Sequence, residues 1–149
     1  MKQIFIVILF LISTSVFSQT TEAIGGVESH INPRDYSRTF HPVFSLNTFF
    51  PISEGINLGA ITTVVVGDSI PDLYYGFKAS VPYIWVSKNK KNAFGLSANV
   101  VMGTKGKLRF GGSLDYIVSP TVSVSLNGGQ IYNERLAYLG LTGSYTLMP

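Results

Sequence analysis

The feature that most constrains this chain is the alternation of polar and apolar side chains over residues 109–127, RFGGSLDYIVSPTVSVSLN. Side chains alternate between the two faces of an extended strand, so this period of two predicts a pair of β-strands joined at Ser119-Pro120. It does not say which face meets water. In a soluble protein the apolar row would face a packed core, whereas in a membrane barrel it would face lipid and the polar row would line the interior.

The alternation continues along most of the chain, in segments separated by Gly-, Pro-, Asn- and Asp-containing turns. We predict strands over residues 40–50, 56–66, 74–87, 93–103, 108–118, 121–131 and 136–147. These segments are longer than the roughly 5–6 residues usual for soluble sheets and close to the 9–11 that a tilted strand needs to cross a bilayer. Because bacterial barrels generally have an even number of strands, residues 23–31 are the expected eighth.

Composition favours lipid as the partner of the apolar row. The chain is 46% apolar and only 13% charged, about half the charged fraction usual for a soluble domain. Aromatic residues gather near the strand ends, as Tyr74, Tyr75, Tyr83 and Trp85 do, which is typical of the two aromatic girdles of an outer-membrane barrel. The small net charge of +3 gives no reason to expect nucleic acid as a partner.

The first residues have the pattern of an export signal. Lys2 supplies the positive start, Ile4 to Ile12 form a nine-residue apolar run, and Ser13 to Ser18 a small polar exit. We expect residues 1–18 to be a signal peptide cleaved near Ser18/Gln19, and residues 19–149 to be a single barrel domain. An uncleaved membrane anchor is the alternative, but nine residues are far fewer than the roughly 20 needed to span a bilayer. The chain has no cysteine, which excludes both lipid attachment through cysteine and disulfides.

Taken together, these features resemble the small eight-stranded outer-membrane β-barrel proteins of the OmpX and OmpA-transmembrane-domain type. The resemblance covers residues 19–149 and rests on the export signal, the alternation, the aromatic girdles and the terminal segment LAYLGLTGSYTLMP. Many such barrels end on an aromatic residue; this chain ends Leu147-Met148-Pro149, with Tyr145 as the substitute.

The fold class implied by the resemblance is all-β, an antiparallel up-and-down transmembrane barrel of about eight strands. The resemblance also implies that the connections 32–39, 67–73, 104–107 and 132–135 are extracellular, and that both termini and the turns 51–55, 88–92 and 119–120 are periplasmic.

An eight-stranded barrel has an interior just wide enough for side chains to fill. We therefore expect the inward polar row to form a hydrogen-bonded network with no transport role. Its members are Lys78, Asn99, Arg109, Asp115 and Asn127. Buried charges need partners, and we expect Asp115 to pair with Arg109 or Lys78. The alternative is a narrow, porin-like pore.

A lipid-modifying enzyme is an alternative function, because some small barrels act on lipid. His30 and His41 flank the first expected extracellular connection, which also contains Arg34, Asp35 and Ser37. A histidine, an acid and a serine are the groups of a nucleophilic site. The chain has no Gly-x-Ser-x-Gly nucleophile elbow, so we expect no catalytic residues, and both histidines serve hydrogen bonding instead.

The remaining candidates concern ions and lipids. Asp68 and Asp72 in GDSIPD are ordinary turn residues, and a calcium site needs more oxygen ligands, so we expect neither a metal nor a cofactor. Lys105, Lys107 and Arg135 lie in expected outer connections and are candidates to contact lipopolysaccharide phosphates, with solvated loop charges as the alternative.

The sequence as a whole predicts a non-enzymatic integral outer-membrane barrel, a structural or interaction protein of the bacterial cell envelope. Its expected partners are outer-membrane lipid or lipopolysaccharide and other outer-membrane proteins, including a larger complex of which the chain would be an accessory subunit. A soluble secreted β-sandwich or lipocalin-like binder, with the apolar row inside, is a further alternative.

Overall fold

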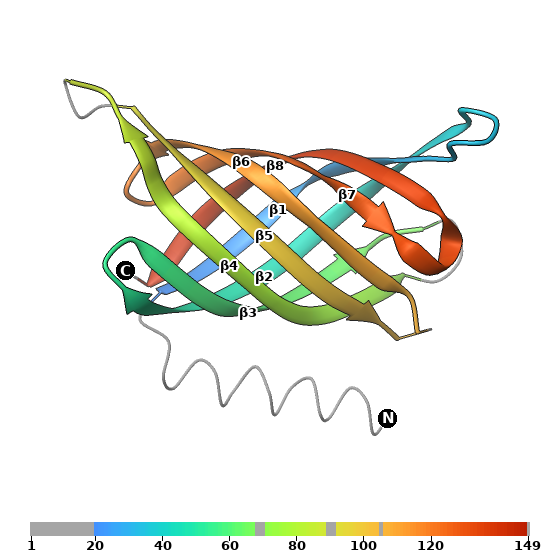
Figure 1. The fold of residues 1–149 in the computed structure, drawn as a ribbon, viewed down its shortest axis with the longest axis horizontal. Helices are drawn as coiled ribbons and strands as arrows, with labels where there is room; N and C mark the ends of the chain where they lie inside the picture. Colours follow the sequence, from blue (N-terminus) through green and yellow to red (C-terminus); the bar gives the residue numbers. More distant parts are fainter. Residues whose placement is uncertain (1–19, 68–70, 89–91, 105, 149) are drawn as a thin grey trace.

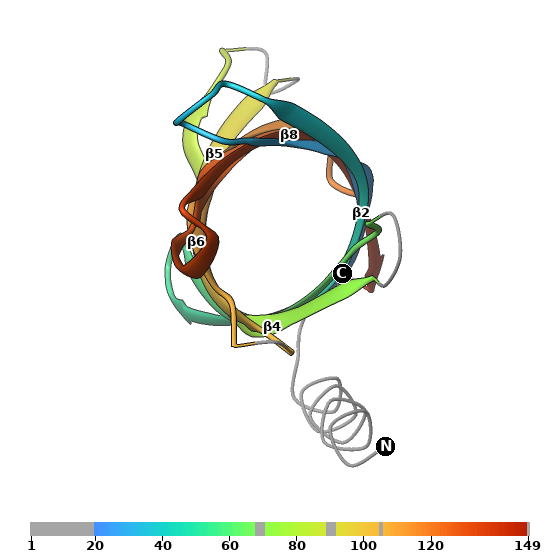
Figure 2. The same ribbon diagram turned by 90° about the vertical axis from the view of Figure 1, so that its right-hand side faces the viewer.

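The computed structural model describes residues 20–67, 71–88, 92–104 and 106–148, and it is a closed antiparallel barrel of eight strands (Figures 1 and 2). The strands are β1 (Thr20–Ile31), β2 (Arg38–Ser53), β3 (Ile56–Val65), β4 (Asp72–Val86), β5 (Ala93–Gly103), β6 (Leu108–Ser119), β7 (Val122–Ile131) and β8 (Leu136–Met148). A single turn of 3-10 helix, η1 (Tyr132–Glu134), joins β7 to β8. Among the described residues, no helix has the length and hydropathy to cross a membrane.

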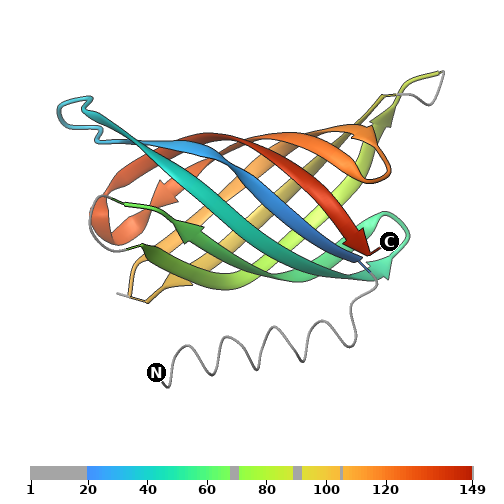
Figure 3. The same ribbon diagram turned by 180° about the vertical axis from the view of Figure 1, so that it is seen from behind.

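Each strand pairs with its neighbours in the sequence, and β1 also pairs with β8, which closes the barrel (Figure 3). The predicted up-and-down topology and strand number are confirmed. The expected eighth strand is β1, which begins three residues earlier than predicted, at Thr20. β2 is also longer than its predicted range of 40–50, because the ladder with β1 continues to the pair Ile31–Arg38. The predicted signal peptide, residues 1–18, lies outside the described residues.

The barrel has two distinct ends. The connections 32–37, 66–71, 104–107 and 132–135 share one end, here called the loop end. The first residue of β1, the last residue of β8 and the tight turns share the other, here called the terminal end. This grouping is the one that the resemblance implied. Residues 68–70, 89–91 and 105, in three of the connections, are not described.

The outer face of the barrel is mainly apolar. In the pairing of β6 with β7, Phe110 is 38% exposed and Leu126 51% exposed, whereas Arg109 and Ser113 on the opposite face are 7% and 6% exposed. The lumen is therefore the polar side of the wall. This sidedness is the reverse of that in a soluble sandwich or a lipocalin-like binder, whose apolar row packs inside.

Candidate functional site

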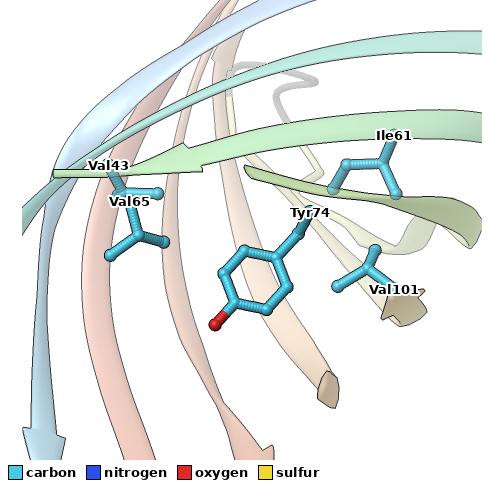
Figure 4. Packing of buried hydrophobic residues seen from close by; sticks show 5 residues of the cluster. All are labelled: Val43, Ile61, Val65, Tyr74 and Val101. Atoms are coloured by element: carbon cyan, nitrogen blue, oxygen red, sulfur yellow. The ribbon is translucent and has the colours of Figure 1, made fainter. Parts of the chain in front are cut away.

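The lumen is the candidate functional site, and its half nearest the loop end is filled by side chains. Val43, Ile61, Val65, Tyr74 and Val101, from β2 to β5, form a buried apolar cluster on one side of the lumen (Figure 4). Tyr74 is only 1% exposed. Packed aliphatic and aromatic groups leave little room for water, so this cluster closes one side of the lumen.

An ion pair fills the other side at the same level. Arg109 of β6 donates from Nη1 to Glu28 Oε1 at 2.8 Å and from Nη2 to Glu28 Oε2 at 2.6 Å. Both residues are buried, at 7% and 3% exposure. A two-pronged geometry satisfies both carboxylate oxygens and holds the guanidinium in one plane. Strands β1 and β6, which are not neighbours in the barrel, are thereby joined across the lumen.

The guanidinium of Arg109 stacks on the ring of Tyr138. The guanidinium carbon lies 3.7 Å from the centroid of the Tyr138 ring and 5.6 Å from that of Tyr74. The Tyr138 side chain reaches over two lumen glycines: a Cβ built on Gly111 would be 2.0 Å from its hydroxyl oxygen, and one built on Gly129 would be 2.7 Å from it. Glycine is needed at both positions, because a Cβ would collide with Tyr138 and also with the backbone of the neighbouring strand.

His30 extends the ion pair towards the loop end. Its Nε2 donates to Glu28 Oε1 at 2.7 Å, and its ring lies 4.5 Å from the ring of His41. The Val66 carbonyl can only accept, so His41 Nδ1 donates to it at 3.3 Å and Nε2 accepts from Thr39 Oγ1 at 2.8 Å. A histidine with this tautomer can accept the hydroxyl proton of Thr39, as a general base does.

The acid of the proposed enzyme alternative does not reach the histidines. Asp35 accepts hydrogen bonds from the backbone N–H and the hydroxyl of Ser37, at 3.0 and 2.7 Å. These bonds stabilise the carboxylate, so the pKa of Asp35 lies below its ordinary value. Asp35 and Ser37 thus organise the β1–β2 connection, while the acidic partner of His30 is Glu28.

Glu28 is the lumen residue that sequence reasoning missed, and the expected partner of Arg109 was wrong. Asp115 lies on the same strand as Arg109, six positions away, which at 3.3 Å per residue is about 20 Å. That separation is too large for contact. The alternation of residues 23–31 places Glu28 and His30 on the inward face. Glu28 could therefore have been recognised as an inward acid at the same end of the barrel as Arg109.

A cavity of about 310 Å³ occupies the lumen at the terminal end. Its lining includes Glu22 of β1, Lys78 of β4 and Asp115 of β6 together with many hydroxyl groups. A smaller cavity of about 40 Å³ lies farther along the lumen, between Lys78 and the Glu28–Arg109 pair. Asn99 and Asn127 line this smaller cavity, and Asn127 donates to Thr142 Oγ1 at 2.8 Å. The five residues expected in the interior therefore face the lumen in two groups, one at each cavity.

The candidates for lipid phosphate lie at the loop end. Lys107 Nζ lies 2.6 Å from Asp72 Oδ2, at the start of β4, and 2.6 Å from Glu134 Oε1, in η1, so its charge joins its own connection to both. Partial burial acts to lower the pKa of Lys107, but its hydrogen bonds to the two carboxylates outweigh this and raise it.

Arg135 is exposed and has a left-handed backbone, with φ of 54°. It borders a groove of about 670 Å³ with Pro33, Gln130 and Tyr132. Lys105 lies outside the described residues.

The described residues contain no group of three or more His, Cys, Asp or Glu side chains placed to hold a metal ion.

Comparison with known proteins agrees with this fold and adds no family. No protein-family model matches the chain, and no curated protein matches it. A solved structure described as "De novo design of transmembrane beta-barrels" matches with a TM-score of 0.56 and 17% sequence identity, covering 87% of this chain and 97% of the other. The chain is thus similar in fold to a small eight-stranded barrel of the transmembrane type.

Proposed function

We propose that this chain is an integral β-barrel of the bacterial outer membrane that works without enzymatic activity, as a structural or interaction protein of the cell envelope. The observation that carries the proposal is the sidedness of the wall. Outward side chains such as Phe77, Leu96 and Leu141, which are 61%, 47% and 61% exposed, would cost free energy in water and are stabilised by lipid.

Aromatic residues at the terminal end support membrane insertion. The ring centroids of Trp85 and Phe94 lie 5.7 Å apart, and those of Phe94 and Tyr116 lie 5.3 Å apart, so three strands share one aromatic cluster. Tyr116 donates its hydroxyl proton to Asn92 Oδ1 at 2.9 Å. Rings with an apolar body and a polar tip are favoured at the boundary between lipid headgroups and acyl chains.

Trp85 is the only tryptophan in the chain and tests this proposal directly. The barrel is refolded into vesicles whose phospholipids carry bromine either near the headgroup or at the end of the acyl chain. We expect headgroup-proximal bromine to quench Trp85 fluorescence more strongly. Equal, weak quenching by both lipids, together with recovery of the protein without detergent, would contradict membrane insertion.

The expected partners are lipids and other outer-membrane proteins. Of the three basic residues considered for lipid phosphate, Arg135 has the setting that best supports this role, because it is exposed beside a groove at the loop end. Membership of a larger outer-membrane complex is tested by co-purification from native membranes in mild detergent. Recovery of the barrel alone, at the mass of a single chain, would contradict an accessory-subunit role.

The lipid-modifying alternative is tested through its histidines. Replacing both His30 and His41 by Gln should leave the lipid composition of the envelope unchanged in mass spectrometry. A changed lipid profile, with the barrel still folded, would favour the enzyme over the structural protein.

A further inference from the structure

Lys78 is a buried cation without a partner of opposite charge in contact. It is 8% exposed, and its Nζ lies 5.6 Å from the centroid of the Phe49 ring. Throughout the part of the chain that the structure describes, its ammonium forms no hydrogen bond and no ion pair. Buried ammonium groups are ordinarily paired or hydrogen-bonded, since removing them from water is costly. Lys78 lines the cavity at the terminal end, so its three donors have that space available to them.

Two carboxylates line the same cavity and are not in contact with that ammonium. Glu22 interacts electrostatically with Lys78 and with Asp115, yet no ion pair within 4 Å joins Lys78 to either acid. One oxygen of Asp115 accepts a hydrogen bond from Ser113 Oγ at 2.7 Å. The cavity therefore presents positive and negative groups on separate parts of its wall.

The rest of the cavity surface is rich in hydroxyl groups. Ser80, Ser119, Ser123, Ser125, Ser144 and Thr146 all contribute to its lining. Its volume of about 310 Å³ is near the lower limit for small-molecule sites and equals that of about ten water molecules. Access is from the terminal end, because the Glu28–Arg109 pair and the apolar cluster fill the lumen farther along.

From these observations we propose that the terminal-end cavity binds a small zwitterion. The anionic group of the ligand accepts hydrogen bonds from Lys78, and its ammonium group lies against the carboxylates of Glu22 and Asp115. A simple anion would leave the two carboxylates without a partner of opposite charge, and a simple cation would leave Lys78 without one, whereas a zwitterion pairs with both signs. The anionic group is either a phosphate or a carboxylate, which are equally matched to an ammonium donor.

Titration calorimetry on the full barrel in detergent micelles tests this inference. Two zwitterions are used as probes, glycerophosphoethanolamine and glycylglycine, which carry a phosphate and a carboxylate respectively. Glycerol 3-phosphate and ethanolamine, each with one sign of charge, are the matched comparisons. We expect saturable binding of at least one zwitterion at millimolar concentration, and the probe that binds identifies the anionic group. No binding of either zwitterion, or equally strong binding of a comparison compound that carries only one sign of charge, would overturn the proposal.

Variants locate the binding in the cavity. Lys78→Met, Glu22→Gln and Asp115→Asn should each weaken binding by about tenfold, the loss expected for one charge-assisted contact. Lys88→Met and Asp35→Asn change exposed residues outside the cavity and should leave the affinity unchanged. Each variant is first checked for the β-sheet circular dichroism of the parent. If Lys78→Met does not fold, Asp115→Asn provides the test, because it keeps the size of the side chain and its hydrogen bond to Ser113. Unchanged affinity in a folded Asp115→Asn variant would overturn the assignment of the site.

Discussion

At the scale of single residues, the pairing of Glu28 with Arg109 is the interaction whose loss has the clearest consequence. Removing one partner of a buried ion pair leaves the other charge without compensation, which costs about 3 kcal/mol or more. We predict that Glu28→Gln or Arg109→Met alone lowers the free energy of unfolding by about this amount. The double variant should be more stable than the sum of the two losses predicts. Urea unfolding in micelles, followed by Trp85 fluorescence, measures all three, and strictly additive losses would contradict the coupling.

A second prediction at this scale concerns Gly111, whose lack of a side chain makes room for Tyr138. A Cβ at this position would also lie 2.4 Å from the carbonyl oxygen of Gly128, so the backbone itself must shift. We predict that Gly111→Ala destabilises the barrel by about 1–3 kcal/mol. Gly128→Ala is the control, since its Cβ would meet its nearest neighbours at an ordinary 3.6 Å. Equal stability of the two variants in urea unfolding would contradict this role of Gly111.

At the scale of elements, Lys107 joins its own β5–β6 connection to the first residue of β4, Asp72, and to the β7–β8 connection through Glu134. We predict that Lys107→Met leaves the strands folded and increases amide hydrogen exchange in η1 and Thr104. Lys88→Met, at the opposite end, should not change this exchange. Protection in η1 that is unaffected by Lys107→Met would contradict the link.

The pH dependence of this link follows from the raised pKa of Lys107. Its folded pKa lies above the ordinary value of 10.5, so the protonated form is favoured by folding. The stabilisation is therefore fully present below pH 10.5 and is lost as the pH rises through the folded value. Exchange in η1, corrected for the intrinsic rate at each pH, should be constant between neutral pH and pH 10. A rise within that range would contradict the assignment.

Alternation predicted the strands and the inward position of the polar residues, but it predicted neither the apolar cluster in the lumen nor the contacts across it. The facing of Lys78, Asn99 and Asn127 follows from local periodicity, since each residue is placed by its own strand. The partner of Arg109 does not, because Glu28 lies 81 positions away, and the two meet only through the stagger of eight strands. For the same reason, the role of Lys107 could not be predicted from the sequence of its own connection, because its partners Asp72 and Glu134 lie in other parts of the barrel.

At the scale of the whole molecule, the lumen is blocked at the loop end and hollow at the terminal end. We predict that the barrel, inserted in a planar bilayer, gives no steady ionic conductance. Glu28→Ala combined with Arg109→Ala should keep the barrel folded and give small current steps, because it shortens both blocking side chains on one side of the lumen. Tyr145→Phe, on the outer surface, is the control and should not conduct. Steady conductance by the unaltered barrel would show that the lumen is open.

The pairing of β1 with β8 also constrains how the chain acquires its structure. Strands β2 to β7 each pair with the strands that precede and follow them in the sequence, but β1 also pairs with the last strand, β8. Until β8 arrives, two sheet edges carry unpaired backbone groups, which makes any partial assembly prone to aggregation. Closure of the barrel therefore comes late. It depends on contacts between β1 and β8, which are far apart in the sequence, and such contacts form slowly. A chain built in this way depends on being kept from premature association until its final strand has been delivered.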